Sequence, residues 1–149
     1  MLTDHVLIVD DEAPVRMVLS RWINAIGYET TEADSAETAL EEMTARPAAV
    51  VFSDVQMPGQ GGLWLAGVLR AQFPETAIVL VTGVTTIPAT TTMRAGFLAY
   101  LTKPFNAREV RSALEKSIIW HAAAVAAGPQ PSQTDDEGDQ LKTWLDSLE

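Results

Sequence analysis

The sequence contains no cysteine, only three lysines and no long apolar run. The lack of cysteine excludes disulfides and thiolate chemistry, and it is typical of a protein that works in the cytosol. None of the apolar runs approaches the roughly 20 residues that a helix needs to cross a bilayer. The N-terminus also lacks the basic stretch that precedes the apolar core of a secretory signal. We therefore expect a cytoplasmic location and no membrane association.

Positive charge is scarce, because 20 acidic residues outnumber 10 basic residues and leave a net charge of −10. This balance argues against direct binding to nucleic acid. Residues 128–149 hold six acidic residues and one lysine, and they begin with a stretch rich in glycine and proline. We expect one globular domain over residues 1–127, followed over residues 128–149 by an acidic linker that ends in a short amphipathic segment.

Short apolar runs alternate with helical patterns along residues 1–127. The runs at 6–9, 50–52, 78–81 and 98–102 are predicted strands, whereas the more polar residues 28–32 suit an edge strand. A helical pattern follows each strand, but it is weak at 85–96, where a proline and three consecutive threonines oppose a helix. This alternation predicts a doubly wound α/β fold of the flavodoxin-like kind. Its five-stranded parallel sheet has the order 2-1-3-4-5, with helices on both faces.

Local signals mark two of the helices. Residues 34–37, Asp-Ser-Ala-Glu, form a capping-box pattern in which Glu37 is placed to reach back to the cap. Asn106 is the predicted cap of a long last helix. Ile119 and Trp120 fall off the apolar stripe of this helix, and we interpret them as a dimer or partner surface rather than stray exposure.

Polar residues follow four of the predicted strands. They are Asp10, Asp11 and Glu12; Asp54; Thr82; and Lys103. In the order 2-1-3-4-5 the first and third strands are neighbours, so their carboxylates meet at the edge where such sheets bind ligands. Clustered carboxylates repel one another and favour a hard cation such as Mg²⁺ or Mn²⁺.

This set has the parts that move a phosphoryl group onto a carboxylate. Asp54 is the predicted nucleophile. A metal held by Asp11 and Asp54, with Asp10 in support, would neutralise charge on the phosphoryl oxygens. Lys103, Thr82 and nearby backbone N–H groups would hold the remaining oxygens.

The chain resembles the receiver domain of two-component response regulators over residues 4–124. The resemblance is carried by Val-Asp-Asp-Glu at 9–12, Asp54 followed by Met-Pro-Gly at 57–59, Thr-Gly at 82–83, and Tyr-Leu-Thr-Lys-Pro-Phe at 100–105. It implies that Asp54 accepts a phosphoryl group from a histidine kinase or a histidine phosphotransfer protein. It also implies a signalling switch that promotes its own phosphorylation and dephosphorylation, not a conventional enzyme.

The same resemblance assigns roles to individual residues. It implies that Mg²⁺ is bound by Asp11, Asp54 and the backbone carbonyl of Gln56, with Asp10 acting through water. Thr82 and Tyr100 would form the switch: the hydroxyl moves toward the phosphoryl group and the ring turns inward. The Lys103–Pro104 peptide bond is expected to be cis.

The family's output surface is expected where residues 85–96, the last strand and the last helix come together, and it could serve a homodimer or an output partner. The segment between Thr82 and Lys103 is about one residue shorter than is usual for the family. This difference affects the output surface, because residues 85–96 belong to it.

Four alternatives remain open from the residues. The acidic run at 10–12 could cap the first helix, and Tyr100 could be a packing residue only. A metal-dependent aspartyl phosphatase of the dehalogenase type also uses an aspartate on a parallel sheet, but it places a second acid two residues after the nucleophile, where this chain has Gln56. A flavodoxin-like nucleotide binder needs a first loop rich in Ser, Thr and Gly, and here that loop is acidic.

Overall fold

The computed structural model describes residues 4–83 and 97–128. This part of the chain holds five strands and four helices. The strands are β1 (His5–Val9), β2 (Glu29–Ala33), β3 (Val50–Asp54), β4 (Ala77–Thr82) and β5 (Phe97–Thr102). The helices are α1 (Ala13–Ile26), α2 (Ala36–Ala45), α3 (Gly62–Gln72) and α5 (Ala107–Ala127). The helix predicted at residues 85–96 and the linker predicted after Gly128 lie outside the described residues.

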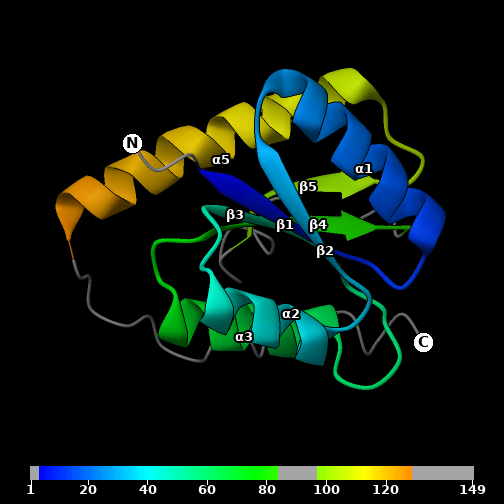
Figure 1. Cartoon of the computed structure of the whole chain (residues 1–149), viewed down its shortest axis with the longest axis horizontal. Helices are drawn as coiled ribbons and strands as arrows, with labels where there is room; N and C mark the ends of the chain where they lie inside the picture. Colours follow the sequence, from blue (N-terminus) through cyan, green and yellow to red (C-terminus); the bar gives the residue numbers. More distant parts are fainter. Residues whose placement is uncertain (1–3, 84–96, 129–149) are drawn as a thin grey trace.

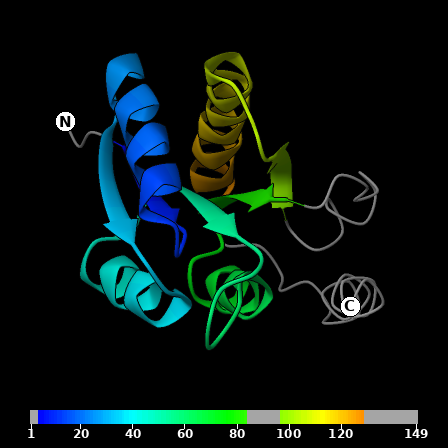
Figure 2. The ribbon, with the colours of Figure 1, turned by 90° about the vertical axis from the view of Figure 1, so that its right-hand side faces the viewer.

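The strands form one parallel sheet in the order β2-β1-β3-β4-β5, which confirms the predicted topology. Helices α1 and α5 cover one face of the sheet, and α2 and α3 cover the other (Figure 1). The view turned by 90° shows the same three layers, with the sheet between the two helix pairs (Figure 2).

Alternating side chains of the central strands supply the core on both faces. On β1, Val6 and Ile8 pack in the cluster beneath α1 and α5, whereas Leu7 and Val9 belong to the cluster beneath α2 and α3. Every residue of β1, β3 and β4 is buried, while β2 is partly exposed. A strand covered by helices on both faces needs apolar side chains in both directions, which is why the polar residues of β2 are found at the sheet edge.

The capping box predicted at residues 34–37 is wrong. Ser35 is the N-cap of α2, and its hydroxyl oxygen accepts a hydrogen bond from the backbone N–H of Thr38 at 3.1 Å. The carboxylate of Glu37 instead accepts the backbone N–H of Gln60 at 3.0 Å, from the loop after β3. The Glu37 side chain, which the local pattern assigned to the cap, is therefore bonded to a partner distant in sequence.

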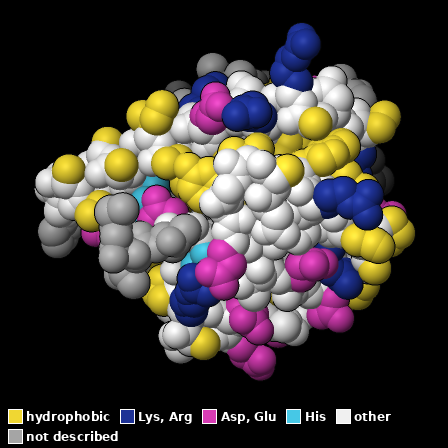
Figure 3. Space-filling view, turned by 45° about the horizontal axis from the view of Figure 1, so that its top comes forward, with side chains coloured by type: hydrophobic (Ala, Val, Ile, Leu, Met, Phe, Trp, Pro, Cys, Tyr) yellow, Lys and Arg dark blue, Asp and Glu magenta, His cyan; other side chains and the backbone are white. Residues whose placement is uncertain are grey.

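Helix α5 begins at the predicted cap. The Asn106 side chain accepts the backbone N–H of Glu109, and the Glu109 side chain accepts the backbone N–H of Asn106, which completes a capping box. Ile119 and Trp120 are exposed by 72% and 39%, as their position off the buried stripe predicts. Figure 3, with the α1 and α5 side turned forward, shows hydrophobic side chains along this surface. The helices in residues 4–83 and 97–128 are each too short or too polar to span a bilayer.

Candidate phosphoryl-acceptor site

Asp10 and Asp54 meet at the carboxyl edge of the sheet. Val9 at the end of β1 pairs with Ser53 on β3, so the next residue of each strand is one of the two aspartates. Asp10 is exposed by 1% and Asp54 by 6%. The parallel pairing of two neighbouring strands thus brings two carboxyl groups, distant in sequence, into one buried position.

Lys103 links these carboxylates to a third one. Its Nζ lies 3.1 Å from Oδ2 of Asp10, 3.2 Å from Oδ2 of Asp54 and 3.0 Å from Oε2 of Glu12. Lys103 directly follows β5, where its backbone N–H donates to the carbonyl of Thr82 at 2.8 Å. The Lys103–Pro104 peptide bond is cis, as the sequence predicts. Pairing at the end of β5 therefore fixes the backbone of Lys103, and its ammonium group lies among the carboxylates of Asp10, Glu12 and Asp54.

The charges of the site shift the pKa of each group. Burial raises the pKa of Asp54, and the neighbouring charge of Asp10 raises it further, against the opposing effect of Lys103. Burial also raises the pKa of Asp10. Burial alone would lower the pKa of Lys103, but its hydrogen bond to Glu12 and the charges of Asp54 and Asp10 outweigh that effect and raise it. The acids are thus incompletely compensated by the one ammonium group.

Asp10, Glu12 and Asp54 form a group suited to a metal ion. One ligand oxygen of each lies within 4.8 Å of the others. Oδ2 of Asp10 is buried and, apart from the ammonium group of Lys103 at 3.1 Å, has no partner among the described residues. A buried carboxylate oxygen that shares one ammonium group with two other acids, and a donor set made only of carboxylates, both fit a hard divalent cation.

Glu12 is a member of this group that the sequence reasoning did not assign as a ligand. Asp11, the predicted direct ligand, is exposed and lies between Asp10 and Glu12 in the chain. Glu12 occupies the N-cap position of α1 but its side chain makes no capping hydrogen bond, so the capping alternative does not describe it. The signal available in the sequence was the unbroken acidic run at 10–12. That run does not show which of its carboxylates contact Lys103.

The remaining predicted residues lie at or near the same edge. The backbone N–H of Gln56 donates to Oδ1 of Asp54 at 3.2 Å. Thr82 is the last residue of β4 and is buried. Tyr100 lies on β5, paired with Leu80, and is exposed by 39%. The ring of Tyr100 is therefore accessible from outside, whereas the Thr82 side chain belongs to the interior.

The loop after Asp54 is held at two further points. A Cβ atom added to Gly62, the first residue of α3, would clash with the carbonyl oxygen of Asp54. Only glycine permits this close approach of the helix start to the strand end. At the other side of the loop, Gln60 is bonded to Glu37 of α2. Both α2 and α3 are thus in direct contact with the segment that carries Asp54.

Comparison with known proteins gives a consistent result. Residues 6–115 match the family model of the response regulator receiver domain. The chain is 38% identical over 104 residues to the response regulator protein FleR of Pseudomonas aeruginosa, which covers 69% of this chain and 22% of FleR. It is 30% identical over 115 residues to the transcriptional regulatory protein FixJ of Bradyrhizobium diazoefficiens, covering 76% of this chain and 56% of FixJ. This chain therefore spans less than two thirds of either relative.

A solved structure matches over nearly its whole length. The receiver domain of NtrX from Brucella abortus superposes with a TM-score of 0.72 at 30% identity, and the match covers 76% of this chain and 98% of that one. Asp10, Glu12, Asp54 and Lys103 all lie within the residues that match the family model.

Proposed function

The chain belongs to the response regulator receiver family, and from that premise we propose that Asp54 accepts a phosphoryl group from a histidine kinase or a histidine phosphotransfer protein. The protein is a phosphorylation-regulated signalling module, not a conventional enzyme. The observation that carries the assignment of Asp54 is its contact with Lys103 beside Asp10, in a buried position at the carboxyl edge of the sheet. This family assignment replaces the dehalogenase-type phosphatase considered from the sequence.

The transfer is a direct exchange of bonds. A carboxylate oxygen of Asp54 attacks the phosphorus of the phosphohistidine, the new O–P bond forms as the P–N bond breaks, and the leaving imidazole nitrogen takes up a proton. Lys103 holds a phosphoryl oxygen through its ammonium group. The hydroxyl of Thr82 and backbone N–H groups of the loops at this edge hold the others.

The acidic group would hold Mg²⁺, with Mn²⁺ as an alternative. We assign Asp11, Asp54 and the backbone carbonyl of Gln56 as ligands, with Asp10 in support, and the structure adds Glu12 as a further carboxylate at this place. When bound, the ion neutralises the negative charge on the phosphoryl oxygens.

The signal would leave the site through Thr82 and Tyr100. Movement of the Thr82 hydroxyl toward the phosphoryl group would open space into which the exposed ring of Tyr100 turns. The change would reach an output partner or a second copy through β5 and α5, together with residues 84–96, which lie outside the described part. We assign residues 1–127 to this receiver unit, residues 128–149 to a linker, and its action to the cytoplasm.

Phosphorylation by acetyl phosphate with Mg²⁺ tests the assignment. On a phosphate-affinity gel we expect the wild-type protein to shift and Asp54→Asn to remain unshifted. Asp34→Asn, which changes an exposed aspartate at the end of β2, is the matched control and should shift like the wild type. Equal labelling of wild type and Asp54→Asn would refute the role of Asp54.

A further inference from the structure

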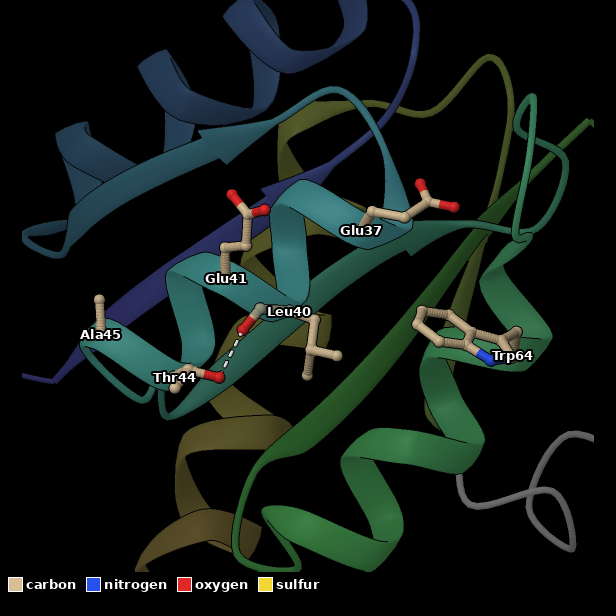
Figure 4. A pocket seen from close by; sticks show the side chains of 6 residues that line it. All are labelled: Glu37, Leu40, Glu41, Thr44, Ala45 and Trp64. Carbon is tan, nitrogen blue, oxygen red and sulfur yellow. Dashed lines mark hydrogen bonds between the residues drawn. The ribbon is translucent and has the colours of Figure 1, made fainter.

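A groove lies between α2 and α3, on the face of the sheet opposite α1 and α5. It has a volume of about 580 Å³ and is lined by Glu37, Leu40, Glu41, Thr44, Ala45 and Trp64. Figure 4 shows Leu40 of α2 and Trp64 of α3 pointing into the space between the helices, with the two glutamates along α2. Trp64 is exposed by 37%, although it is a large apolar side chain. The groove therefore offers an apolar floor that the described part of the chain leaves accessible.

The charge of the groove has one sign. Its two charged residues, Glu37 and Glu41, are both exposed and lie one helical turn apart, so their like charges face the same rim. Glu41 makes no hydrogen bond or ion pair with any residue of the described part. The hydroxyl of Thr44 is already bonded to the carbonyl of Leu40 at 2.8 Å. The polar group left for a partner at this rim is thus an uncompensated carboxylate.

Both walls of the groove contact the loop that carries Asp54. Glu37 on the α2 wall accepts the backbone N–H of Gln60. Trp64 lies in the first turn of α3, two residues after Gly62, which abuts the carbonyl of Asp54. A molecule seated between Glu37 and Trp64 therefore touches two residues whose positions depend on how the loop after Asp54 is arranged.

We propose that this groove is a docking site for an amphipathic helix of a partner protein that carries lysine or arginine beside its apolar face. The apolar floor between two helices suits a helix laid into it, and the acidic rim selects for positive charge. A second copy of this chain, with a net charge of −10, and its own acidic residues 128–149 have the wrong sign. The affinity changes on phosphorylation, a coupling that rests on the proposed function of Asp54.

The experiment uses two synthetic amphipathic peptides, one with leucines on one face and lysines beside them, the other with glutamate in place of each lysine. Fluorescence anisotropy with the full chain should show binding of the lysine peptide only. Trp64→Ala should weaken it about tenfold or more, as truncation of a central aromatic anchor does. Glu41→Lys should weaken it and reduce its dependence on salt. Met17→Ala and Glu75→Lys, which alter exposed residues elsewhere, are the controls and should bind normally.

The coupling is tested on the same protein treated with acetyl phosphate and Mg²⁺, with the phosphorylated fraction measured on a gel. A changed affinity in wild type and none in Asp54→Asn supports it. Unchanged affinity of a fully phosphorylated protein overturns the coupling and leaves the function of Asp54 standing. The docking site itself is overturned by equal binding of the two peptides, by unaltered binding to Trp64→Ala, or by a self-association in the ultracentrifuge that Trp64→Ala abolishes.

Discussion

The ammonium nitrogen of Lys103 lies 3.2 Å from a carboxylate oxygen of Asp54, although 49 residues separate the two in the chain. The same nitrogen contacts Asp10 and Glu12, so one positive charge faces three negative ones. This arrangement holds the site together before any cation or phosphoryl group is bound. Lys103 therefore has a structural role and a functional role, and its substitution can separate the two.

Lys103→Ala is expected to fold but to lose stability and switching. Without the ammonium group the carboxylates repel one another, and we expect the free energy of unfolding to fall by an amount on the order of 2 kcal/mol. This loss is smaller than for fully buried pairs, because Glu12 is exposed. Mg²⁺ should restore part of this loss because it supplies the missing positive charge. Urea unfolding with and without Mg²⁺ measures both effects, and Lys116→Ala on the exposed side of α5 is the control. A variant that keeps its full phosphorylation-dependent change would contradict the role given to Lys103.

The raised pKa values of Asp10 and Asp54 predict a pH dependence in the absence of metal. Between the ordinary value of 3.8 and the raised values, the folded state holds protons that the unfolded state has released. The stabilising contribution of these groups is therefore complete below pH 3.8 and is lost as the pH rises through the raised pKa values.

Asp54→Asn should flatten this dependence, because asparagine stays uncharged in both states. In EDTA at neutral pH, the variant is expected to be more stable than the wild type. Added Mg²⁺ should reduce this difference in stability between the two proteins. Thermal unfolding over a pH series in EDTA and in Mg²⁺ gives the comparison. A wild-type protein in EDTA whose stability rises with pH through this window, relative to Asp54→Asn, would show that the carboxylates are compensated.

Gly62→Ala tests the contact between α3 and the end of β3. The added methyl group would clash with the carbonyl oxygen of Asp54, and we expect the free energy of unfolding to fall by about 2–3 kcal/mol because α3 has to move. Gly67→Ala is the matched control in the same helix, where a Cβ meets nothing within 4 Å. That substitution should stabilise the protein by about 0.5–1 kcal/mol, because alanine is the better helix former. Similar unfolding midpoints for the two variants would argue against the close approach.

Ser35→Ala and Asp34→Ala test the observed cap of α2 against a cap at Asp34, the first residue of the capping-box pattern. Removal of the Ser35 hydroxyl leaves the backbone N–H of Thr38 without its acceptor, and we expect a loss of about 1 kcal/mol. Asp34→Ala should change the free energy of unfolding by less than about 0.5 kcal/mol, as is usual at exposed positions. Chemical denaturation of both variants decides between the caps, and the larger loss for Asp34→Ala would restore the sequence-based prediction.

Much of this protein could be read from its sequence because the signals are local. Four apolar runs and one polar run give the strands, and a strand buried on both faces cannot tolerate the charges of residues 29–32, so β2 had to lie at the edge. Each polar residue that directly follows a strand had to lie at the carboxyl edge of a parallel sheet. The meeting of Asp10, Asp54 and Lys103 follows from that geometry.

The tertiary structure alone decided which side chains complete the site and its surroundings. Periodicity cannot tell which carboxylates of the run at 10–12 contact Lys103, because that depends on the path of the chain from β1 into α1. In the structure the carboxylates of Asp10 and Glu12 contact Lys103, although the Glu12 side chain stays exposed. The partner of Glu37 is Gln60, 23 residues away, so no local pattern predicts it. The same holds for the groove that places Leu40 beside Trp64, since a surface shared by two helices exists only once both have packed against the sheet.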